Sequence, residues 1–432
     1  MMIDVKKVVV EKKFLLPFIL ITSLFSLWGF ANDITNPLVA AFRTVMEISN
    51  AKAALVQFAF YGGYGTMAIP AALFVQRYSY KAGILLGLAL YAVGALLFFP
   101  AAQYEMFVFF LLSLYILTFG LAFLETTANP YILAMGSQET ATRRLNLAQS
   151  FNPMGSLLGM FVASQYILTN LESDKRDAAG NLIFETLSAA EKAVIRTHDL
   201  EAIRNPYVIL GFVVIIMFII IALYKMPKRE GTDHTVHPMI SARRLLKNVR
   251  YREGVIAQLF YVGAQIMCWT FIIHYAENLG IPKSTAQNYN IVAMVFFLTS
   301  RFIATMLMKY MNPKLLLTLF ALGGMTTTAG VILIGGMPGL YLLIATSGFM
   351  SLMFPTIYGI ALVGLKEDTT LGAAGLVMAI VGGALMPPLQ GAIIDFGTVG
   401  FLPAVNFSFI LPFICFVVIA IYGYRTMKVH LE

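Results

Sequence analysis

Charged side chains are scarce in this sequence: they make up 12% of its 432 residues, whereas hydrophobic residues make up 59%. Soluble globular domains carry about 25% charged residues, so roughly half of the usual charge is missing. Apolar runs of about 20 residues, each long enough to cross the hydrocarbon core of a bilayer, recur from Phe14 to Tyr424. The composition therefore excludes a soluble protein and predicts an all-α membrane protein.

Cysteine is also rare, and the two present, Cys268 and Cys415, lie in apolar runs far apart in the sequence. They indicate buried small residues and neither a disulfide framework nor a metal site. The sequence contains no Walker P-loop, which excludes ATP hydrolysis as an energy source. It contains no catalytic constellation either, so we expect no enzyme, no cofactor and no metal.

Apolar runs and the residues that interrupt them predict twelve spanning helices in two groups of six. The expected domains are an N-terminal six-helix bundle at 1–226 with an outer loop at 170–204, a cytoplasmic linker at 227–252, and a C-terminal six-helix bundle at 253–432. The spans are expected near 14–42, 53–76, 81–101, 105–135, 144–168, 205–226, 253–279, 285–310, 313–336, 338–364, 371–395 and 403–425.

The net charge of +8 does not indicate nucleic acid, because it reflects where lysine and arginine lie between spans. Most of the 30 basic residues fall in the segments that become cytoplasmic when the N-terminus is placed inside the cell. This asymmetry satisfies the positive-inside rule and predicts that both termini are cytoplasmic.

Two polar segments carry helix signals of their own. Ser188 and Glu191 form a capping-box pattern that predicts a short surface helix within the outer loop. Residues 241–247 are amphipathic and basic, which predicts a helix lying along the anionic inner leaflet. A solvated connector is the alternative for both segments.

The two halves resemble each other weakly. Trp28 and Trp269 each lie well inside the first span of their half, and Pro130 in the fourth span matches Pro355 in the tenth. Gly155 in the fifth span has a counterpart in the glycines at 382–383. Two halves with broken or glycine-rich helices are typical of secondary transporters with a binding site near the membrane midplane.

Two carboxyl groups lie well inside the predicted spans, away from their ends. Glu125 lies near the middle of the fourth span, where an ionisable group needs a function or a partner. A carboxyl there can take up a proton from one face and release it to the other. Asp33 lies on the first span with Asn32 and Asn36 within one helical turn. Each group also has a structural interpretation. Glu125 could be a buried carboxyl that pairs with a nearby arginine or hydroxyl, and the polar side chains around Asp33 could satisfy backbone carbonyls where the helix opens locally.

Amides and aromatic rings repeat at helical spacing in two other spans. Gln149 and Asn152 are i,i+3 neighbours on the fifth span. Gln258, Tyr261, Gln265 and Trp269 follow one stripe of the seventh span. Buried amides can also hold neighbouring helices together, but a stripe of amides, a phenol and an indole suits a wet cavity better than lipid.

This combination of side chains predicts a sugar site. A sugar has hydroxyls at its edge and apolar C–H faces, which match amides, a carboxylate and an aromatic ring. An anionic substrate is disfavoured, because Arg301 alone among the basic residues lies well inside a predicted span, away from its ends, and a structural role is expected for it. The predicted substrate-binding residues are Trp28, Asn32, Asn36, Asn129, Gln149, Asn152, Tyr261, Gln265 and Trp269.

Four motifs carry a family resemblance that runs from about Phe14 to Tyr424. They are Leu124–Glu–Thr–Thr–Ala–Asn–Pro130, Arg144–Leu–Asn–Leu–Ala–Gln–Ser–Phe–Asn152, Tyr261–Val–Gly–Ala–Gln–Ile–Met–Cys–Trp269 and Phe354–Pro–Thr–Ile–Tyr358. Together they resemble the fucose–galactose–glucose/proton symporters, a branch of the major facilitator superfamily, and most of all its bacterial L-fucose/proton symporters.

The resemblance implies a twelve-helix transporter of two six-helix bundles that works by alternating access in the bacterial inner membrane. It implies a role in proton coupling and sugar recognition for Glu125, and sugar contacts for Gln149 and Asn152. Two positions depart from the pattern. Asn36 stands where the fucose transporters have a proton-coupling aspartate, with Asp33 one turn earlier in place of asparagine, and Phe354 replaces a tyrosine.

The expectation is a monomeric transporter that imports a monosaccharide together with protons, with Glu125 as the proton carrier and Asp33 as an auxiliary. A passive sugar uniporter and a drug or lipid exporter of the same fold remain alternatives. A membrane-bound sensor or enzyme is disfavoured, because no long soluble domain is present in the sequence.

Overall fold

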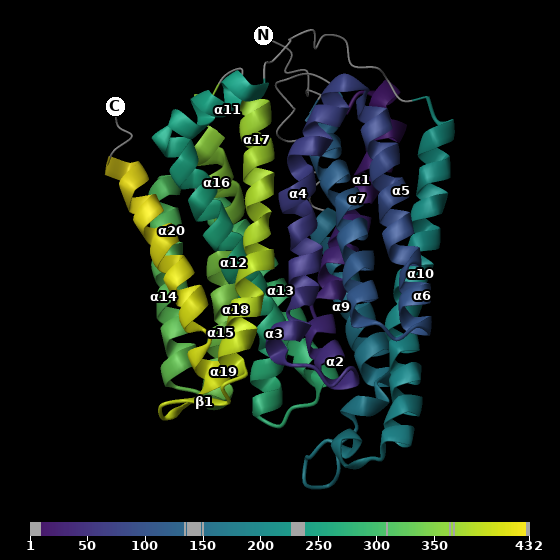
Figure 1. The fold of residues 1–432 in the computed structure, drawn as a ribbon. Helices are drawn as coiled ribbons and strands as arrows, with labels where there is room; N and C mark the ends of the chain where they lie inside the picture. The colour runs from purple at the N-terminus through teal and green to yellow at the C-terminus, as the bar shows by residue number, and fades with distance from the viewer. Residues whose placement is uncertain are drawn as a thin grey trace, which may run out of the picture.

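The structure of the chain is a computed structural model. It describes residues 10–133, 135, 148, 151–225, 238–307, 310–362, 364–365 and 368–428. We refer to residues 10–225 as the N-terminal half and to residues 238–428 as the C-terminal half. Each half consists of long helices that run between the same two ends of the molecule (Figure 1).

The described elements of the N-terminal half are η1 (Lys12–Phe14), α1 (Leu15–Thr35), α2 (Leu38–Val45), α3 (Asn50–Ala53), α4 (Leu55–Arg77), α5 (Tyr80–Leu96), α6 (Phe98–Gln103), α7 (Phe107–Leu133), α9 (Phe151–Val162), η3 (Ala163–Ile167), η4 (Leu168–Asn170), η5 (Glu172–Asp174), η6 (Ile183–Thr186) and α10 (Ala189–Leu223).

The described elements of the C-terminal half are α11 (Pro238–Lys247), α12 (Val249–Asn278), α13 (Lys283–Leu307), α14 (Pro313–Leu333), α15 (Gly336–Met350), α16 (Met353–Leu362), α17 (Thr369–Met378), η8 (Ala379–Val381), α18 (Gly382–Ile394), β1 (Thr398–Val399), β2 (Leu402–Pro403), α19 (Ala404–Phe407) and α20 (Ile410–Lys428). The two short strands pair as an antiparallel hairpin, which the sequence analysis did not predict.

Ten helical segments of the described chain are long and apolar enough to cross a membrane. The remaining two predicted spans correspond to α9 with η3 and to α13, which has 25 residues. Large apolar side chains on the outside of the bundle fit this assignment. On α10, for example, Ile209, Phe212 and Ile216 are 63%, 58% and 56% exposed and follow one helical face. A surface of this kind is stable against lipid and not against water.

Several predicted spans are interrupted by proline or glycine. The first span ends its regular helix at Thr35, and α2 begins after Pro37, because proline has no N–H to continue the hydrogen-bond ladder. The eleventh span consists of α17, a single 3₁₀ turn η8, and α18, which begins at Gly382. These breaks put polar backbone groups and irregular turns inside the bundle, where transporters place their sites.

The outer loop differs from its prediction in one respect. The capping box of Ser188 and Glu191 is present, with Ser188 accepting a hydrogen bond from the Glu191 backbone N–H. The helix that it starts is not a short surface helix, however, because α10 continues without interruption to Leu223. Pro206 lies inside it without ending it, since the helix is packed along its length against α5 and α6. The prediction of a separate short helix was wrong.

The basic segment after the N-terminal half contains the predicted helix, α11. Arg244 on α11 binds both oxygens of Asp368, at 2.8 Å from Nε and 2.6 Å from Nη2. This hydrogen-bonded guanidinium lowers the pKa of Asp368 below its usual value. The helix α12 begins at Val249, capped by Asn248, four residues before the start predicted for the seventh span.

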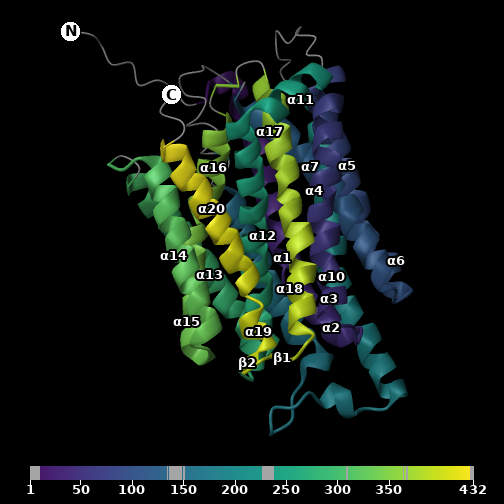
Figure 2. The same cartoon turned by 60° about the vertical axis from the view of Figure 1, so that its left-hand side comes forward.

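The two halves meet along α4 of the N-terminal half, which packs against α17, η8 and α18, and along α13, which contacts α9 and η3 (Figures 1 and 2). We call the end that carries α2, α3, the 170–188 loop and the β1–β2 hairpin the loop end. The opposite end, with α11 and the end of α20, is the α11 end (Figure 1).

Glycines allow the closest helix contacts within the N-terminal half. A Cβ added at Gly155 on α9 would overlap the backbone of Ser26 on α1, and one added at Gly29 would overlap the backbone of Asn152. Backbone atoms at this contact cannot move aside as a flexible side chain can. The contact brings α1 and α9 together, and these helices carry Asp33 and Asn152.

We expect Gly155→Ala to separate α1 from α9 and to destabilise the folded chain by about 1–3 kcal/mol, as overpacking usually does. Thermal unfolding of the purified protein in detergent measures the change. Gly359→Ala is the matched control, because a Cβ at this helical glycine meets nothing within 4 Å. Equal stability of the two variants would contradict the importance of this contact.

Candidate functional site

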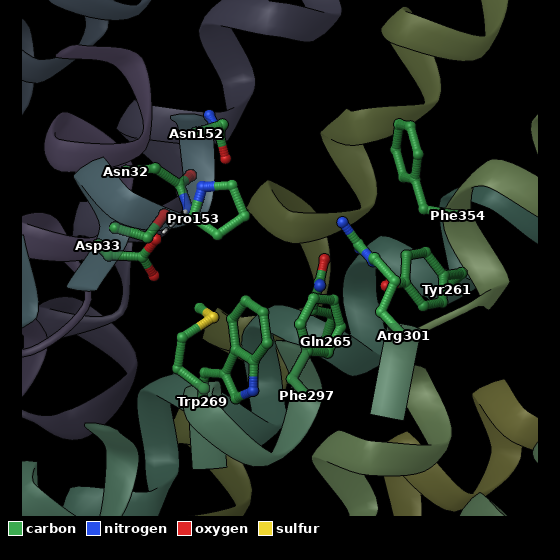
Figure 3. A pocket seen from close by; sticks show the side chains of 12 residues that line it. Asn32, Asp33, Asn152, Pro153, Tyr261, Gln265, Trp269, Phe297, Arg301 and Phe354 are labelled. Atoms are coloured by element: carbon green, nitrogen blue, oxygen red, sulfur yellow. Dashed lines mark hydrogen bonds between the residues drawn. The ribbon is translucent and has the colours of Figure 1, made fainter. Parts of the chain in front are cut away.

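A cavity of about 170 Å³ lies between the two halves. The helices α1 and α9 line it from the N-terminal half, and α12, α13 and α16 line it from the C-terminal half (Figure 3). Its lining residues are Asn32, Asp33, Asn152, Pro153, Ser156, Tyr261, Gln265, Trp269, Met294, Phe297, Arg301 and Phe354.

The wall from the N-terminal half is polar. Asp33 is 1% exposed, and its carboxylate accepts hydrogen bonds from Asn36 Nδ2 at 3.0 Å and from Asn32 Nδ2 at 3.4 Å. Asn152 on α9 donates to the carbonyl oxygen of Phe25 at 3.2 Å, which fixes its amide beside the cavity. A carboxylate with two amides offers both donors and acceptors to a ligand with hydroxyl groups.

The wall from the C-terminal half is mainly aromatic. Trp269 donates from its indole N–H to Ser347 Oγ at 3.1 Å and packs edge-on against Phe297, with ring centroids 5.1 Å apart. Tyr261 and Phe354 form another edge-on pair at 6.1 Å. Three of the four residues of the predicted α12 stripe, Tyr261, Gln265 and Trp269, line the cavity, whereas Gln258 is fully buried outside it.

Arg301 lines the cavity, although the sequence analysis expected a structural role for it. Its Nε donates to the carbonyl oxygen of Ser351 at 3.0 Å, and its guanidinium lies over the Phe297 ring at 4.6 Å from the centroid. These contacts hold the side chain in place, and the cavity also exposes it to a ligand. In Figure 3 the Asn32, Asp33 and Asn152 side chains face Gln265, Trp269 and Arg301 across the pocket.

Other predicted site residues lie outside the cavity lining. Trp28 stacks on Phe25 and donates to the Tyr64 hydroxyl at 2.8 Å. Asn36 is 1% exposed and lies behind Asp33, where it contacts Gln57. Gln149 and the side chain of Asn129 lie outside the described residues.

Glu125 on α7 is partly buried and does not belong to the cavity lining. Its carboxyl lies within electrostatic range of the hydroxyls of Tyr64 on α4 and Tyr358 on α16. Because Tyr64 and Tyr358 come from different halves, Glu125 lies close to the boundary between them. Of the two predicted carboxyls, Asp33 is therefore the one at the cavity.

Besides Arg301 and Phe354, which the sequence analysis named without assigning them to the site, four lining residues were not predicted: Pro153, Ser156, Met294 and Phe297. Ser156 continues the stripe of Asn152 by one helical turn, and Phe297 lies one turn before Arg301, so helical spacing alone could have indicated both. Met294 and Pro153 are apolar residues in apolar runs, and their sequence carries no signal that separates them from ordinary packing residues.

An ion-pair cluster joins the two halves at the loop end. Glu277 at the end of α12 pairs with Lys283 at 2.9 Å, with Arg43 at 3.1 Å and with Arg176 at 3.7 Å. Lys283 also pairs with Asp174 at 2.7 Å, and its side chain is completely buried. Arg43, Asp174 and Arg176 belong to the N-terminal half, so the cluster links the two halves at the loop end.

Comparison with known proteins agrees with the architecture. The family model described as Major Facilitator Superfamily matches residues 19–387. The chain belongs to the major facilitator superfamily. A major facilitator fold accounts for the twelve spans and confirms the predicted all-α membrane class, as well as the prediction of a transporter and not an enzyme.

Individual members of the superfamily match nearly the whole chain. The L-fucose-proton symporter of Haemophilus influenzae is 72% identical over 424 residues, covering 98% of this chain and 99% of the relative. The L-fucose-proton symporter of Escherichia coli is 35% identical and covers 96% and 93%. The crystal structure of the major facilitator transporter FucP in the outward conformation superposes with a TM-score of 0.72 at 33% identity, covering 96% and 99%. The resemblance to fucose–galactose–glucose/proton symporters is confirmed.

Removing the central acid of the loop-end cluster is expected to open this end. In Glu277→Gln the cations Lys283, Arg43 and Arg176 lose a shared counter-charge, and breaking a buried pair costs about 3–5 kcal/mol. A cysteine introduced at Ser164, which bonds Asn288 of the other half at 3.0 Å, should then react faster with a bulky maleimide.

The control for this prediction is Glu253→Gln, which breaks a partly exposed pair with Arg425 at 2.8 Å within the C-terminal half. Exposed pairs contribute about 0–1 kcal/mol, so this change should leave the labelling rate unaltered. Unaltered labelling in Glu277→Gln as well would show that the cluster does not hold the loop end closed.

Proposed function

We propose that the chain is a secondary active transporter that imports a monosaccharide of the fucose, galactose and glucose class together with protons, with L-fucose as the first candidate. The observation that carries the proposal is the cavity between the halves, where a buried carboxylate and amides face an aromatic wall. The similarity to the L-fucose-proton symporters of Haemophilus influenzae and Escherichia coli supports both the sugar and the proton.

The geometry fits a sugar better than a lipid or a drug. Hydroxyl groups can bind Asn32, Asp33, Asn152 and Gln265, while the apolar face of the sugar can lie on Trp269. The cavity of about 170 Å³ favours a compact ligand over an extended acyl chain. Galactose and glucose remain in the proposed class, because a glucose/galactose transporter of Brucella abortus is 31% identical over 93% of this chain.

Proton coupling is assigned to Glu125 and Asp33. Asp33 lies at the cavity, where it can respond to a bound sugar, and Glu125 lies near Tyr64 and Tyr358 at the boundary of the halves. The membrane potential contributes about 2.3 kcal/mol per charge at 100 mV, which supports an accumulation ratio of about fifty for one proton per sugar.

The division into two bundles with a cavity between them supports transport by alternating access. In this proposal the bundles at 1–226 and 253–432 rock about the cavity, the loop end faces outside, and both termini lie in the cytoplasm of a bacterial inner-membrane protein. The distribution of lysine and arginine supports this orientation. A monomer remains the expected functional unit.

The proposed function is tested with the purified chain in proteoliposomes under an imposed inward proton gradient. A panel of labelled hexoses and 6-deoxyhexoses should give uphill uptake of L-fucose or a close relative. Collapse of the gradient with a protonophore should abolish accumulation while leaving exchange. Uptake that is unaffected by the protonophore would identify a passive uniporter, and transport of lipophilic cations without sugar uptake would identify an exporter.

Glu125→Gln is expected to abolish gradient-driven accumulation, so that the sugar ratio falls from about fifty at 100 mV towards one. Sugar exchange at equal pH should continue, because exchange needs no net proton movement. Glu185→Gln, an exposed loop position, is the matched control. Sugar-coupled proton uptake at the normal rate in Glu125→Gln would refute its assignment.

Asp33→Asn is expected to have the same effect on accumulation and also to weaken sugar binding, because Asp33 lines the cavity. A hydrogen bond to a charged group contributes about 1.5–3 kcal/mol, which corresponds to a loss of sugar affinity of about tenfold or more. Equilibrium binding of labelled sugar measures this loss. The double variant Asp33→Asn with Asn36→Asp returns a carboxyl to the same hydrogen-bonded cluster and should recover part of the accumulation. Full accumulation by the single variant would exclude Asp33 from coupling.

A further inference from the structure

A series of hydrogen bonds through Asp33, Asn36, Gln57 and Thr270, which we call the relay, leads from the cavity to the contact between the halves. Asn36 Nδ2 donates to Asp33 Oδ1 at 3.0 Å. The Nε2 atom of Gln57, on α4, donates two hydrogen bonds. One goes to Asn36 Oδ1 at 3.1 Å and the other to Thr270 Oγ1 at 2.9 Å. Thr270 lies on α12 of the C-terminal half. Two side-chain amides therefore connect the cavity carboxyl to the opposite half.

The four side chains of this relay are almost completely buried, and Asp33 alone among them also lines the cavity. Asp33 and Asn36 are 1% exposed, and Gln57 and Thr270 are completely buried. In such surroundings each hydrogen bond is stronger than in water, and a polar atom left without a partner is unfavourable. The orientation of each amide is therefore set by its neighbour. When one group at the end of the relay exchanges a donor for an acceptor, the next group must reorient to keep its hydrogen bond.

The observed arrangement suits an ionised Asp33. A carboxylate can only accept hydrogen bonds, so Asn36 turns its NH₂ group towards it and presents its carbonyl oxygen to Gln57. Gln57 must then present its own NH₂ group. As a result, Gln57 Oε1 is buried without a hydrogen-bond partner among the described residues.

A protonated Asp33 suits the opposite arrangement. Its new O–H can donate to the Asn36 carbonyl oxygen once that amide has turned over, which leaves the Asn36 NH₂ group facing Gln57. If Gln57 turns as well, its Oε1 accepts from Asn36 and from the Thr270 hydroxyl, and its NH₂ group takes the position that Oε1 now occupies without a partner. The proton comes from the cavity and stays on Asp33, and no proton leaves the amides or Thr270.

We propose that Gln57 is a positioning residue that transmits the protonation state of Asp33 to the contact between the halves at Thr270. Gln57 donates to Thr270 when Asp33 is ionised and accepts from Thr270 when Asp33 is protonated. Reversal of this bond changes how the C-terminal half is held against α4. The inference rests on the proposed role of Asp33 in proton coupling.

Few other ionisable groups face Asp33 from the packed elements of the described chain. Tyr61 on α4 donates to Asn32 Oδ1 at 2.7 Å, and Arg301 on α13 and Tyr261 on α12 lie across the cavity. From α9 the Ser156 hydroxyl, which donates to the carbonyl oxygen of Gly29 at 3.4 Å, lies near the Asp33 carboxyl. None of these groups connects Asp33 to Gln57, so Asn36 is the link through which Gln57 responds.

The test compares Gln57→Met and Thr270→Val with the unaltered chain in proteoliposomes. Both changes keep the volume of the side chain and remove the relay. We expect gradient-driven sugar accumulation to fall about tenfold, within the usual range for coupling between two sites, while sugar exchange at equal pH stays within about twofold. The dependence of exchange on pH should also flatten. Thr270→Ser restores the hydroxyl and should restore accumulation.

A purely structural role would lower exchange and accumulation together and leave the pH profile unchanged, and that result would overturn the proposal. Normal accumulation in both Gln57→Met and Thr270→Val would overturn it too. Asp33→Asn, measured in parallel, distinguishes a failure of the relay from a failure of the proposed role of Asp33 in proton coupling. If it loses accumulation while the relay variants keep it, the relay alone is wrong, and if it keeps accumulation, the role of Asp33 is wrong.

Discussion

The need to satisfy polar groups in an apolar, membrane-spanning interior shapes this structure. A carboxyl at Asp33 requires donors around it, and Asn32 and Asn36 supply them. Asn36 in turn requires a partner, which Gln57 provides, and Gln57 reaches Thr270 of the other half. One buried charge thereby determines the polar side chains of three helices. The cavity lies where part of this set remains open to a ligand.

The same requirement explains two of the contacts that join the halves. The loop-end cluster of Glu277, Lys283 and Arg43 and the relay through Gln57 are both polar contacts across the boundary. A polar contact can be exchanged for bonds to water or to substrate when the halves separate, whereas an extended apolar interface has no such replacement. Such contacts suit alternating access, in which each closed end must reopen. A sugar bound between Asp33 and Trp269 would touch both halves at once, which gives it a direct effect on their separation.

The parts of the fold that depend on local sequence were predictable. The spans, the capping box at Ser188 and the helix near Arg244 follow from hydropathy and helix signals. The α12 stripe placed Tyr261, Gln265 and Trp269 together, because helical spacing is a local property. Trp28 has the same local appearance, but its indole N–H donates to the hydroxyl of Tyr64 on α4 and the ring lies outside the cavity lining. The sequence around Gln57 and Thr270 did not indicate a functional role for either residue. Isolated polar residues in apolar runs are common, and the hydrogen bond between these two forms only when the halves are assembled.

The central claim is that sugar and protons cross together by way of buried carboxyls at the boundary of the two halves. The most direct test records external pH while L-fucose is added to a lightly buffered suspension of de-energised cells or vesicles that contain this transporter. The account predicts alkalinisation of the medium that starts with sugar addition, runs in constant proportion to sugar entry, and disappears with a protonophore. Sugar entry at the same rate with no change in external pH would contradict it.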